Sequence, residues 1–236
     1  MRLNPKNEFE RFIFGSLQDG YPGYKQVDDI EHIPFLDKTY ISDIPEELTP
    51  FNDRNRISVE PSNAGIHFYK SDYQFKTALL KPLSWVERFA PFKTLITPDV
   101  SIGDGMPRWI RVRNTVLARA AGAIWNEQGF PVVANLRWRS PADYGFVASG
   151  IHQGSVVAVS NYGNRREPQE RATFEHGVLA MVEMIEPAAL MLYGSIDTRL
   201  RDLLESRTQV FIFRPNGPLV KVKESMSDPA NLFDLD

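Results

Sequence analysis

Residues 155–193, SVVAVSNYGNRREPQERATFEHGVLAMVEMIEPAALMLY, contain the pattern that determines the fold class. Residues 155–160 and 188–193 are apolar almost without interruption, which is typical of strands that are buried on both faces. Between them, residues 169–184 place apolar side chains at helical spacing, so the stretch predicts a strand–helix–strand unit. Two such strands pair in parallel through a right-handed crossover.

The same alternation of strands and helices continues on both sides of this unit. We expect strands at 65–69, 92–97, 131–136 and 209–213, and helical segments at 73–80, 85–89, 107–128 and 197–205. Five or six units predict an α/β protein with a mainly parallel sheet, either an incomplete TIM-like barrel or an open doubly wound sheet. A complete barrel needs about 250 residues, so eight full units do not fit.

The regions outside this pattern differ in composition. Residues 1–62 hold 12 acidic and 7 basic side chains, several prolines and one short expected helix beginning near Asn7. Their many aromatic and aliphatic side chains favour an ordered N-terminal arm packed on the main domain over a disordered tail. The main α/β domain is expected at 63–220 and a polar C-terminal tail at 221–236.

Composition excludes several classes of protein. The formal net charge of −3 gives no overall attraction to nucleic acid or anionic lipid, so binding to either needs a local patch. The absence of cysteine excludes disulfides, thiolate metal sites and thiol nucleophiles. No apolar run approaches the length of a membrane span, so we expect a cytoplasmic protein without a membrane partner.

Polar side chains follow the expected strands, at the edge where both candidate architectures bind ligands. Asp99 is the first candidate for acid–base chemistry and Asp72 the second. The candidate ligand-binding residues are Arg108, Asn135, Arg137, Trp138, Arg139, Asn161 and Tyr193. The alternative for each position is structural, because Asn, Asp, Gly and Pro also form turns and cap helices.

Positive charge is concentrated in residues 101–140, which hold six arginines, no lysine and two acids. Arginine favours bidentate recognition of carboxylate or phosphate, and an indole between Arg137 and Arg139 suits stacking on a planar anionic ligand. We expect Arg111 and Arg119 on the exposed side of the 107–128 helix. The alternative is that the arginines of this helix pair with the acidic N-terminal arm.

Known cofactor and catalytic motifs are missing from the sequence. Residues 102–108, IGDGMPR, supply two of the three glycines of a dinucleotide fingerprint, and the next strand ends in Arg137 instead of an acid. The Walker lysine motif, His-Glu-x-x-His and Gly-x-Ser-x-Gly are absent. For Asp72, Asp99 and Asp104, a shared Mg²⁺ site is a weaker interpretation than a role in capping helices. We therefore expect no cofactor and no metal.

Several short motifs together resemble an uncharacterised domain family carried by bacteriophages, plasmids and integrative elements. They are residues 67–72 (HFYKSD), 97–101 (TPDVS), Arg113 and Asn114 with Arg119 and Trp125, 129–133 (GFPVV), Arg137 with Trp138, 154–160 (GSVVAVS), and Tyr193 with Gly194. The resemblance covers about residues 64–196 and implies a mobile-element protein in a bacterial host cytoplasm. It implies no reaction. Family members read Ser-Thr-x-Gly where this chain has Ser160-Asn-Tyr-Gly163.

Three functions remain open at this point. The first is an accessory protein that binds a nucleotide or single-stranded nucleic acid at the strand ends. The second is a hydrolase on a phosphorylated or glycosidic substrate that uses Asp99 and Asp72. The third is a factor that binds a host protein through residues 228–236, where apolar anchors alternate with acids.

Overall fold

The computed structural model describes residues 32–161, 168–215 and 219–220, which build one curled, mainly parallel sheet covered by helices. The parallel strands are β1 (Glu47–Pro50), β2 (Ala64–His67), β3 (Thr94–Ile96), β4 (Val132–Asn135), β5 (Val156–Ser160), β6 (Ala189–Tyr193) and β7 (Gln209–Phe213). The short β8 (Leu219–Val220) pairs antiparallel with β7. The α/β prediction is confirmed.

The strand order decides between the two predicted architectures. The strands follow one another in the sheet as they do in the chain, from β1 to β8. A doubly wound sheet reverses its strand order at a switch point, and no reversal occurs among the described strands. The sheet is therefore the incomplete, barrel-like alternative.

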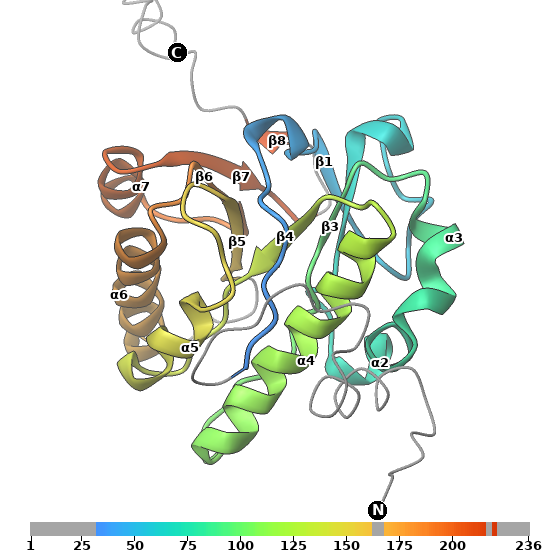
Figure 1. Ribbon diagram of the computed structural model, residues 1–236. Coiled ribbons are helices and arrows are strands. Elements are labelled where there is room, and N and C mark those ends of the chain that lie inside the picture. Colours follow the sequence, from blue (N-terminus) through green and yellow to red (C-terminus); the bar gives the residue numbers. More distant parts are fainter. Residues whose placement is uncertain (1–31, 162–167, 216–218, 221–236) are drawn as a thin grey trace, which may run out of the picture.

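Helices surround the outside of the curled sheet (Figure 1). They are α2 (Asp72–Leu80), α3 (Val86–Phe89), α4 (Arg108–Glu127), α5 (Tyr144–Ala148), α6 (Pro168–Ile185) and α7 (Thr198–Glu205). Short 3-10 turns lie at η1 (Ile41–Asp43), η2 (Pro61–Asn63), η3 (Pro82–Trp85) and η4 (Pro141–Asp143). The expected helix at 107–128 is confirmed, with Pro107 as its N-cap.

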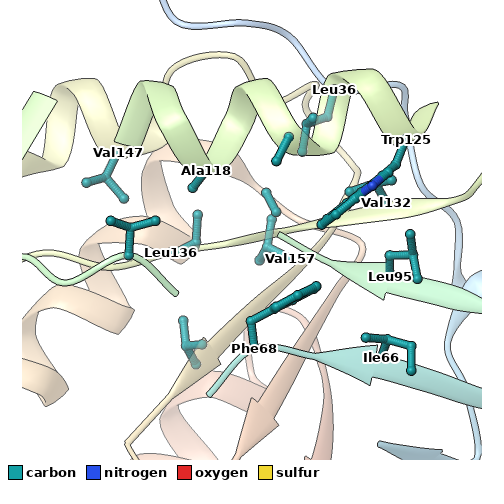
Figure 2. Packing of buried hydrophobic residues seen from close by; sticks show 14 of the residues in the cluster. Leu36, Ile66, Phe68, Leu95, Ala118, Trp125, Val132, Leu136, Val147 and Val157 are labelled. Atoms are coloured by element: carbon teal, nitrogen blue, oxygen red, sulfur yellow. The ribbon is translucent and has the colours of Figure 1, made fainter. Parts of the chain in front are cut away.

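The main core lies between the helices and the outer face of the sheet. Alternation along β4 sends Val132 and Ala134 into this core and Val133 to the inner face. Figure 2 shows Trp125 on α4 packed over the strands, near Val132. Trp125 is fully buried, and its indole N–H donates to the Pro82 carbonyl at 3.1 Å, so its burial leaves no unpaired donor.

The inner face of the sheet shows how strongly the sheet curls. Tyr69, just after β2, stacks on Tyr193 of β6 with ring centroids 4.9 Å apart. Three strands lie between β2 and β6 in the sheet order. Only a sheet that closes much of a barrel brings these two rings into contact.

The segment of residues 32–46 runs across the amino ends of the strands and alongside α4 (Figure 1). Thr39 exchanges hydrogen bonds with Val156, with its hydroxyl donating to the carbonyl at 3.0 Å. Farther along, Lys93 donates to the Ile44 carbonyl at 3.1 Å. The sheet itself begins at Glu47, inside the region assigned to the arm from sequence. The helix expected near Asn7 and the tail at 221–236 lie outside the described residues.

The expectation that Arg111 and Arg119 are exposed is wrong. Arg119 is 1% exposed and donates to the Val147 carbonyl at 2.7 Å. Arg111 forms an ion pair with the fully buried Asp143 at 2.9 Å. Arg111 reaches η4 and Arg119 reaches α5, and these two short elements cover that side of α4. Elements this short give no periodic signal in the sequence.

Among the described residues, no helix is long and apolar enough to span a bilayer.

Candidate functional site

A cavity of about 200 Å³ opens at the carboxyl ends of β3, β4 and β5, beside the first half of α6. Its lining combines acids, arginines and aromatic rings. The lining residues are Asp99, Ile102, Gly103, Asp104, Leu136, Arg137, Trp138, Arg139, Ser160, Glu170, Thr173 and Phe174. This is the edge of a parallel sheet where α/β proteins bind ligands, and we call it the mouth cavity.

Asp99 lies at the centre of the polar network beneath this cavity. Its carboxylate accepts hydrogen bonds from the Asn135 amide and the Arg137 guanidinium, each at 2.7 Å. The backbone N–H of Asn135 donates in turn to the Thr97 hydroxyl at 2.9 Å, which ties the ends of β3 and β4 together. The structure thus brings together three of the residues singled out from sequence.

The environment of Asp99 changes the pKa of its carboxyl. The side chain is 12% exposed, and burial raises the pKa of its carboxyl above the ordinary value of 3.8. Arg137 and the Asn135 hydrogen bond oppose this rise in pKa, whereas the nearby charge of Asp72 adds to it. A carboxyl with a raised pKa at the edge of a cavity can donate and accept protons closer to neutral pH.

A second polar group lies on the inner face of the sheet, formed by His67, Tyr69 and Tyr193. The imidazole Nδ1 of His67 accepts from the Tyr69 backbone N–H at 3.1 Å, so the neutral ring carries its proton on Nε2. Burial and Lys70 lower the pKa of His67 to about 3, which keeps it neutral. Burial, followed by the charge of Asp99, raises the pKa of Tyr69.

Three buried polar atoms of this region have no hydrogen-bond partner in the part of the chain that the structure describes. They are His67 Nε2, the Tyr69 hydroxyl and Asn135 Oδ1. Two groups that can donate, His67 Nε2–H and the Tyr69 hydroxyl, and one acceptor, Asn135 Oδ1, are therefore left for water or a ligand group to satisfy. Sequence reasoning missed Tyr69 as a site residue, although the HFY run that ends the strand expected at 65–69 was the available signal.

Trp138 and Arg139 line the mouth cavity but are engaged within the protein. The indole of Trp138 donates to the Thr173 carbonyl at 3.2 Å and stacks on Phe174 with centroids 6.0 Å apart. Arg139 binds Asp104 through two hydrogen bonds, the longer one at 2.8 Å. Stacking and phosphate contacts by these two residues remain a prediction, and the structure gives each of them a structural role.

The other predicted ligand-binding residues do not line the mouth cavity, and Arg108 lies at the start of α4. Asn161 joins the ends of β5 and β6, because its amide donates to the Ser195 carbonyl at 2.7 Å and accepts from the Ser195 N–H at 3.2 Å. Arg108 donates to the Ala142 carbonyl at 3.2 Å and lies over the Phe146 ring.

Asp72 is directed to the loop between β3 and α4. Its two oxygens accept from the Ser101 backbone N–H at 3.1 Å and from the Ser101 hydroxyl at 2.9 Å. Asp72 therefore positions the segment that carries Asp99. Among the described residues, no group of three or more acids or histidines is close enough to hold a metal ion.

The charge of the mouth cavity is close to neutral and slightly negative. Three acids and two arginines line it, giving −1 if all are ionised. Arg137 pairs with Asp99, and Arg139 pairs with Asp104. A phosphate would have to compete with these carboxylates, whereas an uncharged polar molecule would not.

Comparison with known proteins connects the chain to bacteriophage sequences. The sequence profile of a family described as "Domain of unknown function (DUF4417)" matches residues 25–211. The Gene 1 protein of Mycobacterium phage L5 is 29% identical over 154 residues, which cover 65% of this chain and 67% of that protein. The Gene 1 protein of Mycobacterium phage D29 is 31% identical over 154 residues, covering 65% of this chain and 57% of that protein. No solved structure matches.

Proposed function

The chain belongs to the DUF4417 family of domains of unknown function, and within that fold we propose that the mouth cavity binds a small, uncharged polar substrate on which Asp99 performs acid–base catalysis. The substrate class that suits this site is a glycoside or a related polyhydroxyl compound. The single observation that carries the proposal is the position of Asp99, a nearly buried carboxyl held by two donors at the wall of a cavity.

Positioning of Asp99 supports a catalytic role over a purely structural one. Asn135 at the end of β4 and Arg137 just after it fix both carboxylate oxygens, while burial raises the pKa of the carboxyl above its ordinary value. A carboxyl that only closed a turn would instead bind backbone N–H groups, which lower the pKa. Asp72 binds Ser101 and supports the loop, so its part in the proposal is positioning.

The second carboxyl that glycoside hydrolysis commonly uses is supplied in this proposal by Glu170, which lines the same cavity from α6. One carboxyl protonates the departing oxygen while the other assists water or attacks the sugar carbon. Asp99, whose pKa is raised by burial, suits the acid role.

The experiment is a hydrolysis screen with aryl glycosides and aryl phosphates, using the full-length protein and two variants. Asp99→Asn removes the proposed acid, and we expect a loss of about 10²–10⁴-fold in kcat. Asp104→Asn is the matched control, because Asp104 lines the same cavity but is 79% exposed. Equal rates for the two variants, or a protein inert on every glycoside between pH 4 and about 9, would remove this proposal.

A nucleotide or a short single strand of nucleic acid is the second candidate ligand. The observation that favours it is the 30% exposure of Arg137 beside Trp138 in the cavity lining. Binding of labelled nucleotides and oligonucleotides at about 50 mM salt tests this candidate, since phosphate contacts strengthen at low salt. A Kd unchanged by Arg137→Gln would contradict it. The host-protein hypothesis concerns residues outside the described structure and stays a prediction.

A further inference from the structure

The carboxamide of Asn135 has a protein partner on one side only. Its Nδ2–H donates to Asp99 Oδ1 at 2.7 Å, whereas its Oδ1 is buried without a hydrogen-bond partner in the part of the chain that the structure describes. A half turn of the carboxamide would place its oxygen against the Asp99 carboxylate and lose this bond. A donor on the Oδ1 side would therefore hold Asn135 in the orientation that serves Asp99, and would remove the cost of a buried, unsatisfied acceptor.

Arg119 has the complementary deficit, because it carries buried donors that lack an acceptor. It lies on α4 at 1% exposure, and its Nη2 donates to the Val147 carbonyl at 2.7 Å. Its Nε and Nη1 are buried without a hydrogen-bond partner among the described residues. Burial lowers the pKa of Arg119 to about 9, which still leaves the guanidinium charged at neutral pH. Two donors of a charged group therefore call for an acceptor that protein atoms do not supply.

Asn135 and Arg119 line the same small cavity, between α4 and the ends of β3 and β4. Its volume is about 10 Å³, the space of one water molecule. The other polar side chains of the lining have protein partners for their hydrogen bonds, and they are Asn114, Thr115 and Arg137. The apolar part of the lining includes Val100, Ile102 and Val147.

One water molecule matches the three unsatisfied atoms in number and in kind. Its oxygen can accept from Nε–H and Nη1–H of Arg119, and one of its hydrogens can be donated to Asn135 Oδ1. Buried waters usually make about three hydrogen bonds, to polar groups that would otherwise be unsatisfied. The bonds from Arg119 are charge-assisted, so they are stronger than bonds between neutral groups.

We propose that one buried water bridges the Arg119 guanidinium to Asn135 Oδ1, and that Arg119 is, through this water, a positioning residue for Asp99. The connection runs from α4 through the water and the Asn135 carboxamide to the carboxylate at the mouth cavity. The charge of Arg119 polarises the water and the carboxamide, which strengthens the N–H that Asn135 donates to Asp99. Arg119 does not line the mouth cavity, so it acts without touching a substrate there. The consequence for catalysis rests on the role proposed for Asp99, whereas the bridge itself does not.

The first experiment detects the water by NMR of the full-length protein. We expect a rotating-frame Overhauser cross-peak between Nε–H of Arg119 and a long-lived water, with the sign that separates dipolar contact from chemical exchange. Asn135→Leu removes the acceptor and should abolish the cross-peak. Arg113→Met, which removes an exposed arginine from the same helix, should keep it. A missing cross-peak in the unaltered protein would overturn the proposal, and this outcome does not depend on any variant folding.

The second experiment tests the positioning role by titrating the Asp99 carboxyl with carbon NMR, in a double-mutant cycle of Arg119→Met and Asn135→Leu. Arg119→Met should raise the pKa of Asp99, because the hydrogen bond that favours its ionised form is weakened. In the Asn135→Leu background the same substitution should cause no further rise. Asp72, Tyr69 and Arg137 also act on the Asp99 carboxyl, and they stay unchanged in every variant.

Two results of this cycle would overturn the positioning role. An equal rise in both backgrounds would mean that Arg119 acts on Asp99 by its charge alone, and no rise in either would mean that it does not act on Asp99. Both experiments are independent of catalysis. A protein inert on every glycoside would therefore remove the function proposed for Asp99 and leave the water bridge in place.

Discussion

Gly177 on α6 provides the sharpest test of how the mouth cavity is built. A Cβ added at Gly177 would lie 1.9 Å from the indole Nε1 of Trp138 and 2.1 Å from Cε2. Contacts this short cannot be absorbed without moving the ring, which would break its hydrogen bond to Thr173 and its stacking on Phe174. We therefore predict that Gly177→Ala destabilises the protein.

The size of the effect follows from two opposing contributions. Overpacking of this kind costs about 1–3 kcal/mol, and the very short contact places Gly177→Ala at the upper end of that range. Replacing glycine by alanine inside a helix stabilises the helix by about 1 kcal/mol, which offsets part of that cost. The net expectation is a loss of about 2 kcal/mol in the free energy of unfolding, or roughly 4–8 °C in Tm.

Urea unfolding of a double-mutant cycle measures this contribution. In a Trp138→Ala background the clash is gone, so Gly177→Ala should become stabilising by about 1 kcal/mol. Gly145→Ala on α5 is the matched control, because a Cβ there meets no atom within 4 Å, and we expect a small gain in stability. If Gly177→Ala stabilised the unaltered protein, the indole could not be packed against α6 as described.

Three further predictions concern buried charge and titration. Asp143→Asn should lower the free energy of unfolding, measured in urea, by about 3 kcal/mol, because it leaves the Arg111 guanidinium without its buried partner. Asp104→Asn, at the exposed ion pair with Arg139, should change the free energy of unfolding little. The pKa of His67 is about 3 in the folded protein and 6.5 in the unfolded chain, so only the unfolded chain takes up this proton between pH 7 and pH 5. The free energy of unfolding should therefore fall by about 2 kcal/mol over that range. His67→Phe should remove that loss. The pH dependence that Asp99 contributes has the opposite sign. Because burial raises the pKa of its carboxyl, the stability that Asp99 contributes declines as pH rises above 3.8. Asp99→Asn should remove this decline from a plot of the free energy of unfolding against pH.

The parallel sheet was predictable because its central strands are continuous apolar runs. The strand β1 was not, since Glu47–Pro50 offers one leucine between an acid and a proline, and its burial depends on partners elsewhere in the chain. The curling of the sheet was not predictable either. It depends on contacts such as Tyr69 with Tyr193, between residues more than a hundred positions apart.

The candidate site was predictable where strand direction alone decides the position. Asp99 and Asn135 meet because neighbouring parallel strands end at one edge of the sheet. The partner of Trp138 was not predictable, since nothing in the sequence indicates that the Thr173 carbonyl faces the indole. Arg119 was misplaced because a charged residue in an amphipathic helix is usually exposed, and the short α5 that buries it has too few residues for a periodic signal.

The bond between Thr39 and Val156 joins residues that are 117 positions apart. During synthesis on the ribosome, the segment that carries Thr39 emerges long before β5, the strand to which Thr39 is bonded. Each strand after β1, in contrast, can pair with the strand synthesised just before it. The part of this segment around Thr39 therefore gains its bond to the sheet only after the fifth strand has been synthesised. Nascent chains halted before that point should lose this segment to protease first, and chains extended beyond it should retain it.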